Sequence, residues 1–237
     1  MYHMIKQPVP GAKFNGLRVA PDMFERHIRW LSENNWRFVT MSELVDQKPG
    51  DKVVAVTFDD GFEDNYLNAF PVLKKYKAKA TLYLVVDRHN RDWSVSKKAH
   101  HNSGELKSEV KLSDQQIHEM LASGVFELGG HTKTHANLAK LDRESKYSEI
   151  SESREYLESL FATRLSSFAY PFGIYDKKED PLLVQKAGFN SAVTTEDGIP
   201  AGITQSPFEL QRIKVSGKDG FLAFKIRMRR GRRGLRK

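Results

Sequence analysis

The chain has 237 residues, no cysteine and a formal net charge of +8. This length suits one large domain or two small ones, and the absence of cysteine excludes disulfides and thiolate chemistry. No stretch approaches the roughly 18 consecutive apolar residues of a membrane span, and the first residues hold no long apolar run, so we expect a cytoplasmic protein.

The positive charge is concentrated near the C-terminus. Residues 227–237 carry seven basic side chains and no acid, so the rest of the chain has a net charge of 8 − 7 = +1. A nearly neutral body argues against a nucleic-acid-binding protein. We therefore predict a globular domain over residues 1–224 and a basic tail over 225–237. Such a tail is either a solvated end or a weak ligand of anionic membranes, which would make the protein peripheral to a membrane.

Apolar strand-like segments alternate with amphipathic helical segments. In chain order, we expect a helix over 22–34, a strand over 37–40, a helix over 41–47, a strand over 53–58, a helix over 65–76 interrupted at Pro71, a strand over 79–86, a polar loop over 88–111, a helix over 112–124, a strand over 125–130, a helix over 142–162, a strand and turn over 166–173, a helix over 180–188, and strands over 189–195 and 210–215. This alternation predicts parallel βαβ units in an α/β barrel of six or seven strands. In such barrels the loops after the strands build the active site.

Two adjacent acids end one of the apolar strands. In "VAVTFDDGFEDNY", Asp59 and Asp60 follow the strand and precede Gly61. Neighbouring side chains of a regular strand point to opposite faces, so both carboxylates serve one site only if the chain turns there, which Gly61 permits. The pair therefore indicates a cation site. The alternative is a solvated turn whose acid caps the next helix.

A pair of histidines follows another predicted strand. In "GGHTKTHANL", His131 and His135 are four residues apart, and on a helical turn both imidazoles would face the same way. This spacing suits two nitrogen ligands of one metal ion, although an isolated pair is also typical of exposed histidines. With an aspartate from the other strand end, the histidines would form a His2Asp site with an open position for water. None of the three residues between them is a plausible base, so the second aspartate is the candidate.

These motifs resemble those of the polysaccharide deacetylases of carbohydrate esterase family 4, which contain the NodB-homology domain. The segments "TFDDGFEDNY" and "HTKTH" are similar to the first two motifs of the family, "FAYPFG" to the third and "LQRIKV" to the last. The opening "YHMI" and residues 21–45 resemble the branch that acts on poly-N-acetylglucosamine-type polymers. The resemblance covers residues 2–215 and implies a distorted (β/α)7-type barrel, the NodB-homology fold.

The resemblance also implies roles for individual residues. Asp60, His131 and His135 match the metal ligands, and Asp59 matches the general base that deprotonates water. A backbone N–H near Tyr170 would stabilise the oxyanion. Contacts with the sugar are expected from four further residues: Pro171, Phe172, Arg212 and Trp93. Aromatic side chains among these residues are also typical of protein cores.

The chain departs from the family pattern at two positions. Phe168 stands in the stretch where many members have an arginine that orients the base. Arg212 stands where many have a histidine that protonates the leaving amine, and arginine is too basic for that task. His3 is a candidate for the acid because its segment should end at the same rim. An ordinary, partly buried histidine is an equal interpretation.

The function implied is metal-dependent removal of N-acetyl groups from a sugar in a polysaccharide, lipid-linked glycan or glycoconjugate precursor. The expected cofactor is one divalent ion, with zinc as the first choice and cobalt, nickel or iron as alternatives. Two other functions fit the same residues: a carbohydrate-binding protein with an impaired site, and an O-deacetylase.

Overall fold

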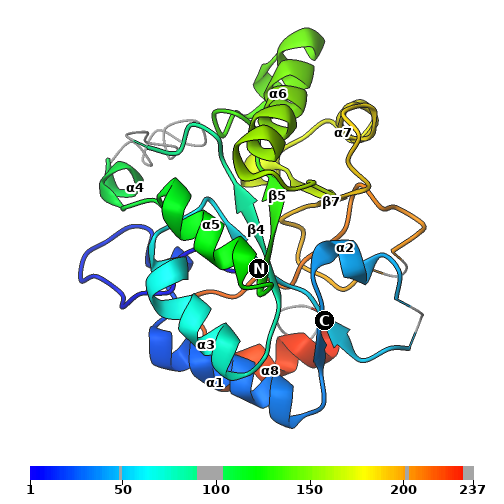
Figure 1. The fold of residues 1–237 in the computed structure, drawn as a ribbon. Helices are drawn as coiled ribbons and strands as arrows, with labels where there is room; N and C mark the ends of the chain where they lie inside the picture. The colour runs from blue at the N-terminus through cyan, green and yellow to red at the C-terminus, as the bar shows by residue number, and fades with distance from the viewer. Residues whose placement is uncertain (48–49, 90–103, 201–202, 232–237) are drawn as a thin grey trace.

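The computed structural model describes residues 1–47, 50–89, 104–200 and 203–231. The principal elements, shown in Figure 1, are α1 (Pro21–Glu33), β1 (Arg37–Phe38), α2 (Met41–Leu44), β2 (Val53–Val54), β3 (Val56–Asp59), η2 (Asn65–Ala69), α3 (Phe70–Lys75), β4 (Ala80–Leu84), α4 (Glu105–Ser108), α5 (Asp114–Ala122), β5 (Phe126–Gly130), α6 (Arg143–Phe161), β6 (Ser167–Ala169), α7 (Asp180–Lys186), β7 (Ser191–Val193) and α8 (Phe221–Arg230). Short 3₁₀ turns lie at Asn15–Leu17 (η1), Leu138–Lys140 (η5) and Pro171–Gly173 (η6).

A five-stranded parallel sheet forms the centre of the fold. Its strands follow the chain in the order β3-β4-β5-β6-β7, and a separate parallel pair is formed by β1 and β2. Each neighbouring pair in the large sheet is parallel, so all five strands end at the same edge. The sheet is curled into a half-barrel with helices outside it, which confirms the predicted α/β barrel class.

Two extended segments join the edges of this sheet. At the β7 edge, Thr194 N–H donates to the Leu210 carbonyl (2.9 Å). Val215 N–H donates to the Met1 carbonyl (3.1 Å), and Tyr2 N–H donates to the Thr57 carbonyl of β3 (2.8 Å). The ring therefore has seven members, five regular strands and two irregular segments. Residues 210–215 pair with β7 only through an isolated bridge, so the regular last strand predicted there is not formed.

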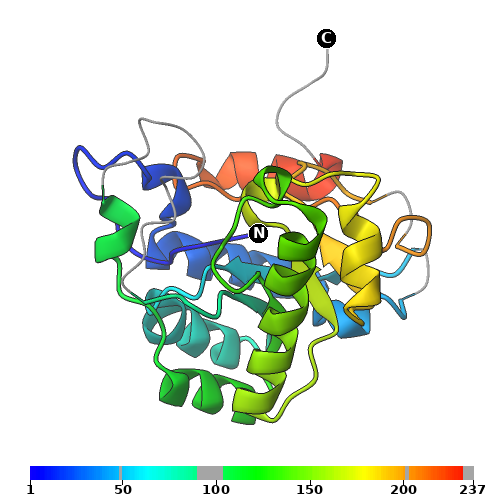
Figure 2. The same cartoon turned by 90° about the horizontal axis from the view of Figure 1, so that it is seen from above.

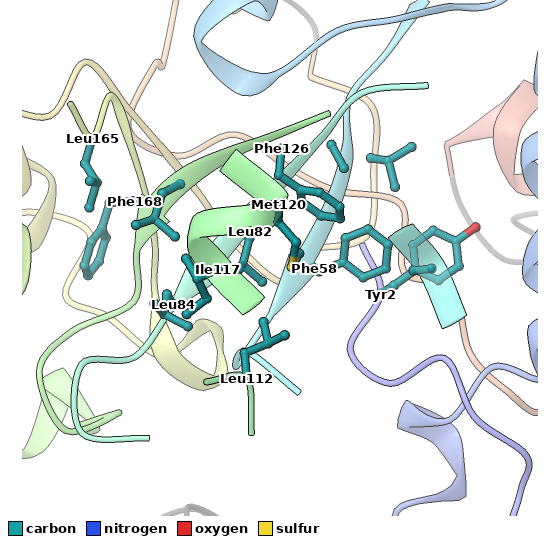
Figure 3. Packing of buried hydrophobic residues seen from close by; sticks show 14 of the residues in the cluster. Tyr2, Phe58, Leu82, Leu84, Leu112, Ile117, Met120, Phe126, Leu165 and Phe168 are labelled. Carbon is teal, nitrogen blue, oxygen red and sulfur yellow. The ribbon is translucent and has the colours of Figure 1, made fainter. Parts of the chain in front are cut away.

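The strands of the sheet alternate between two environments. Side chains that face the helices are apolar and belong to the main core with Ile117 and Met120 of α5: Phe58, Leu82, Leu84, Phe126 and Phe168 (Figure 3). The intervening residues face the barrel interior and include polar groups: Thr57, Asp59, Tyr83 and Ser167. This period of two explains how an acid comes to be fully buried in the barrel.

Three further predicted elements differ from those observed by more than their end residues. The strand expected over 53–58 is divided at Ala55, since β2 pairs with β1 whereas β3 pairs with β4. The helix over 65–76 is a π-helical turn, η2, that continues into α3, with Pro71 in the first turn of α3. The loop over 88–111 contains the short helix α4, and residues 90–103 lie outside the described part.

The basic tail predicted from residue 225 belongs in part to the folded domain. Helix α8 continues to Arg230 and packs beside α1, as Figures 1 and 2 show. Its Phe224 ring stacks on His27 at 3.9 Å, and Met228 is buried. Arg227 is buried as well and pairs with Asp219 at 2.8 Å. The predicted domain boundary at 224 is therefore wrong, because the chain buries side chains beyond it. Among the described residues, no helix is long and apolar enough to cross a membrane.

Candidate functional site

The two adjacent aspartates lie where β3 ends and the chain turns. Asp59 is the last residue of β3, and Asp60 has a left-handed φ of 79°. Gly61 follows with a φ of 71°, and a Cβ there would lie 2.5 Å from Leu84 Cδ1, so both conformation and space favour glycine. This break in the strand allows both carboxylates to reach one site, as the sequence predicts. Asp59 is 2% exposed and Asp60 is 5% exposed.

The loop with the two histidines follows β5 but is not a helical turn. Thr132 and His135 have left-handed φ angles of 63° and 56°, and no helix is assigned there. The loop is held instead by Glu149 of α6, whose carboxylate accepts from Thr134 N–H (2.9 Å) and from the Thr134 hydroxyl (2.7 Å). The imidazoles nevertheless meet, with ring centroids 4.9 Å apart. The expected helical turn is therefore wrong, although the two histidines do share one site.

Asp60, His131 and His135 form a buried cluster of potential metal ligands, and one ligand atom from each lies within 4.8 Å of the others. Asp60 Oδ1 is 3.3 Å from His131 Nε2 and 3.4 Å from His135 Nε2. Two atoms that are each about 2.0–2.1 Å from a tetrahedral zinc ion are separated by roughly 3.3–3.4 Å. The spacing and the donor types therefore fit one divalent ion, and the same donors suit several transition metals.

Neighbouring groups orient His131 and keep Asp60 ionised, as binding of a metal ion requires. His131 Nδ1–H donates to the Ala169 carbonyl at 2.7 Å, which leaves Nε2 directed at Asp60. Burial would raise the pKa of Asp60, but its hydrogen bonds with the two histidines hold that pKa well below its usual value. The carboxylate is thus ionised, the form that a metal ion requires.

Arg212 holds Asp59 in a two-point ion pair. Its Nη1 and Nη2 donate to the two carboxylate oxygens, each at 2.7 Å, and its Nε donates to the Thr194 carbonyl at 2.9 Å. Burial would raise the pKa of Asp59, but the Arg212 guanidinium outweighs it and lowers that pKa below the usual value. The predicted contact between Arg212 and substrate is wrong, because a 6% exposed guanidinium directed into the barrel serves the aspartate instead. Arg212 thus orients Asp59, as an arginine does in many family members. Phe168, which stands in the stretch of that arginine, is buried in the core against the helices.

His3 lies at the same pocket and is held by its backbone. Asn65 Nδ2 donates to the His3 carbonyl at 2.7 Å, and Asp64 accepts from Ile5 N–H at 2.6 Å. The pocket lining includes the His3 side chain together with Asp59 and Asp60. Burial lowers the pKa of His3 below its ordinary value. Its position at the pocket agrees with that predicted for a general acid, and the role itself stays a prediction.

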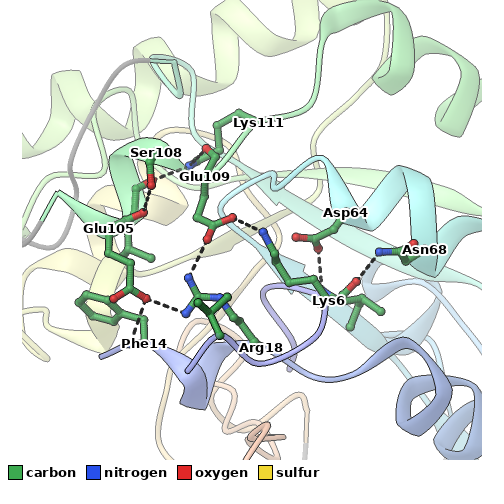
Figure 4. A network of polar contacts seen from close by, with 12 residues as sticks. Lys6, Phe14, Arg18, Asp64, Asn68, Glu105, Ser108, Glu109 and Lys111 are labelled. Atoms are coloured by element: carbon green, nitrogen blue, oxygen red, sulfur yellow. Dashed lines mark hydrogen bonds and ion pairs between the residues drawn. The ribbon is translucent and has the colours of Figure 1, made fainter. Parts of the chain in front are cut away.

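A polar network anchors the segment after His3. Figure 4 shows Glu109 between Lys6 and Arg18, both at 2.6 Å, and Glu105 accepting from Arg18 at 2.6 Å. Arg18 is 1% exposed, so it is a buried cation with two carboxylate partners. The network fastens residues 6–18 to α4 and the segment that follows it, and thereby fixes one wall of the pocket.

The remaining predicted site residues are placed differently. Tyr170 lines the pocket but is fully buried, and both of its polar donors already have partners: the hydroxyl donates to the Phe208 carbonyl, and the N–H donates to the Val193 carbonyl at 3.2 Å. Pro171 is buried and does not line the pocket, which contradicts its predicted contact with sugar. Phe172 is half-buried, lines the pocket, and lies edge-on to His135 with ring centroids at 4.5 Å. Trp93 lies outside the described residues.

The site thus combines a three-ligand cluster, a paired carboxylate and a histidine at one pocket of about 520 Å³. The family model described as "Polysaccharide deacetylase" matches residues 46–191. The chain belongs to this family. The family and the NodB-type fold predicted from the motifs are confirmed, and with them the class of carbohydrate deacetylases.

The curated relatives of this polysaccharide deacetylase include a protein of Bacillus subtilis and one of Staphylococcus aureus. The Bacillus subtilis protein YxkH is 34% identical over 221 residues, which cover 91% of this chain and 70% of that protein. A Staphylococcus aureus poly-beta-1,6-N-acetyl-D-glucosamine N-deacetylase is 30% identical over 192 residues, covering 76% and 61%. The chain therefore spans about two thirds of the length of these relatives.

Solved structures of deacetylases have a similar fold. The Streptococcus pyogenes deacetylase PplD, solved in complex with acetate, has a TM-score of 0.75 at 27% identity and covers 92% of this chain and 91% of its own. A polysaccharide deacetylase from Bacillus cereus has a TM-score of 0.79 at 30% identity, with 96% and 67% covered.

Proposed function

We propose that this polysaccharide deacetylase hydrolyses N-acetyl groups of a glycan, with water activated between a divalent metal ion and Asp59. The observation that carries the proposal is the pairing of Asp59 with Arg212 beside the cluster of Asp60, His131 and His135. A carboxylate that is ionised, oriented and adjacent to three metal ligands is the arrangement that hydrolysis of an amide requires.

The metal ion would be held by Asp60, His131 and His135, and it would supply Lewis-acid activation of water and of the acetyl carbonyl. Asp59 then accepts the proton of the attacking water. Arg212 keeps that carboxylate ionised and fixes both of its oxygens, so the proton acceptor has one orientation. General-base assistance of this kind is worth about 10²–10⁴-fold in rate.

The developing oxyanion needs a donor other than the Tyr170 N–H, which already bonds to Val193. Proline has no N–H, so the next donor along the chain is that of Phe172. No hydrogen bond among the described residues uses the Phe172 N–H, and its left-handed φ of 59° turns the backbone there. We assign the oxyanion contact to this N–H and the protonation of the leaving amine to His3.

The observed partners of Asp59 favour catalysis over a carbohydrate-binding protein with an impaired site. The impaired-site hypothesis depends on a missing arginine and a missing histidine. Arg212 pairs with Asp59 and so takes the place of the missing arginine. His3 lies at the pocket and is a candidate for the missing histidine. Removal of O-acetyl groups would use the same residues and is an outcome of the test below.

The substrate class follows from the relatives. One of them is named for deacetylation of poly-β-1,6-N-acetyl-D-glucosamine, which supports an N-acetylated polysaccharide as the substrate here. The test is acetate release from N-acetylated and O-acetylated forms of the same oligosaccharides, with zinc, cobalt, nickel or iron added to metal-free protein. The His131→Ala variant should lose both bound metal and acetate release. Full metal occupancy in that variant would refute the ligand assignment, and release from O-acetylated sugars alone would refute the N-deacetylase.

We also propose that α8 and the residues after it contact anionic membranes. At 100° per residue, the exposed side of α8 carries an apolar pair flanked by cations: Leu222 and Ile226 lie between Lys225 and Arg229 on one side and Arg230 on the other. Leu222 is 69% exposed. Apolar and basic residues on one helix face are typical of interfacial helices. The cytoplasmic location stays a prediction.

A further inference from the structure

The charged residues that line the catalytic pocket are divided by sign. The acids among them are Asp59 and Asp60, which lie with His131 and His135 at the candidate metal centre. Every other charged residue that lines the pocket, among those described, is a lysine: Lys13, Lys214 and Lys218. We call these three residues the lysine rim. Apolar side chains such as Phe14, Leu17 and Phe172 also line the pocket.

Two members of the lysine rim differ from the lysines of this protein that form ion pairs. Within the described part of the chain, neither Lys214 nor Lys218 takes part in an ion pair. Lys214 is close enough to lower the pKa of Glu196, but hydrogen bonding with Lys177, at 2.8 Å, is the main cause of that shift. Six other lysines each have a carboxylate partner: Lys6, Lys75, Lys79, Lys133, Lys146 and Lys177. The pocket therefore presents two cations, Lys214 and Lys218, that form no salt bridge with the described residues.

The lysine rim disfavours the cationic product that deacetylation of a neutral glycan would give. Removal of an N-acetyl group leaves an amine that is protonated at neutral pH, and this new cation would be formed among lysines. A glycan whose neighbouring sugars were already deacetylated would also be repelled. A negative group on the glycan removes this conflict, because it pairs with the lysines and offsets the positive charge of the product.

We propose that the substrate is an acidic glycan, with a phosphate ester or a carboxylate on the N-acetylated sugar or its neighbour, and that Lys214 and Lys218 recognise this anion. The proposal rests on the proposed deacetylase function and deepens it. Phosphate and carboxylate share the chemistry that a lysine ammonium binds. Lys13 is exposed and extends the same positive field.

The test compares three N-acetylglucosamine oligomers of equal length: a neutral one, one with a phosphate ester on the sugar next to the reacting unit, and one with a uronic acid at that position. The readout is the ratio of kcat/KM for each anionic oligomer to kcat/KM for the neutral one. An exposed ion pair changes an equilibrium by about 1.4–5-fold, so two such pairs, with Lys214 and Lys218, should give a ratio of about 2–25 at low salt. The ratio should fall as salt shortens the Debye length from about 10 Å at 0.1 M to about 3 Å at 1 M.

The double variant Lys214→Met/Lys218→Met removes two charges but keeps the apolar stems, and its ratio should fall toward 1. Lys178→Met is the matched control, since Lys178 is exposed and does not line the pocket, and it should keep the wild-type ratio. A wild-type ratio of 1 with both anionic oligomers, or an undiminished ratio in the double variant, would overturn the proposal while leaving the deacetylase intact. Absence of acetate from every oligomer would instead refute the proposed function. A ratio above 1 for one anion only would identify which of the two the rim binds.

Discussion

Replacing Arg212 with methionine should shift the pH dependence of catalysis. The guanidinium makes two 2.7 Å contacts with Asp59, and both residues are buried. An arginine beside an aspartate lowers the pKa of the carboxyl by about 1–3 units. Without it, the acid limb of kcat/KM, which reports protonation of the base, should move upward by about the same amount.

The same substitution should also destabilise the fold. Removing one member of a buried ion pair costs about 3–5 kcal/mol, because the other charge is left in the interior. The folded-state pKa of Asp59 is depressed, so this ion pair stabilises the protein above the carboxyl's unfolded pKa and loses that effect as pH falls through the folded value. The difference in free energy of unfolding between wild type and variant should therefore be largest near neutral pH and shrink in acid.

The assay is acetate release across about pH 4–9, with metal content measured at each pH so that loss of the ion is not mistaken for protonation of the base. Arg212→Lys is the control, since it keeps the charge but cannot make the two-point contact. It should shift the limb less than methionine does. An acid limb at the wild-type pH in a folded, metal-loaded methionine variant would refute the idea that Arg212 sets the protonation of Asp59.

Four further predictions concern Asp59, His3, Asp64 and the C-terminal residues. Asp59→Asn should keep the metal but lose about 10²–10⁴-fold in kcat, and near wild-type turnover would place the base elsewhere. His3→Ala should flatten the alkaline limb of the pH–rate profile, which burial of His3 places on the acid side of the ordinary imidazole value, and an unchanged profile would leave His3 a structural residue. Burial raises the pKa of Asp64 to about 6, so its charge destabilises the fold as pH rises past the unfolded value, and Asp64→Asn should gain about 1–3 kcal/mol in denaturant unfolding at pH 7 but almost nothing at pH 4. Truncation after Gly231 removes four basic residues but leaves α8 whole, so sedimentation with anionic vesicles should weaken at low salt while acetate release persists; equal sedimentation would exclude a membrane role for residues 232–237.

The proximity of Asp60, His131 and His135 is predictable from the sequence because its evidence is local. Asp60, His131 and His135 follow apolar strands, and parallel strands bring such positions to one edge of a sheet. The conformation of the "HTKTH" loop could not be predicted in the same way. The loop depends on Glu149 of α6, and no spacing within the loop indicates that partner.

The role of Arg212 was harder to predict from the chain. Motif comparison places it where a histidine is expected, and its charge favours an exposed contact with substrate. The decisive fact is that residues 210–215 close the barrel next to β7, so a side chain from this segment meets Asp59 across the interior. A buried arginine in a segment that closes the barrel is a signal that a buried acid lies opposite it. The extent of α8 is hard to predict for a related reason, since arginines lie among its regularly spaced apolar residues Phe221, Phe224 and Met228.

Closure of the barrel through residues 1–2 and 210–215 has a consequence for the order in which the protein folds. The cluster of Asp60, His131 and His135 needs only the central strands, whose contacts connect neighbouring units of the chain. Arg212 and His3 come from opposite ends of the described chain and meet the cluster only when the ring is joined. Pairings this distant in sequence form late and slowly, because the intervening loop must close first. Asp60, His131 and His135 should therefore come together before Asp59 acquires its partner Arg212, so during refolding the candidate metal cluster should form before the paired carboxylate.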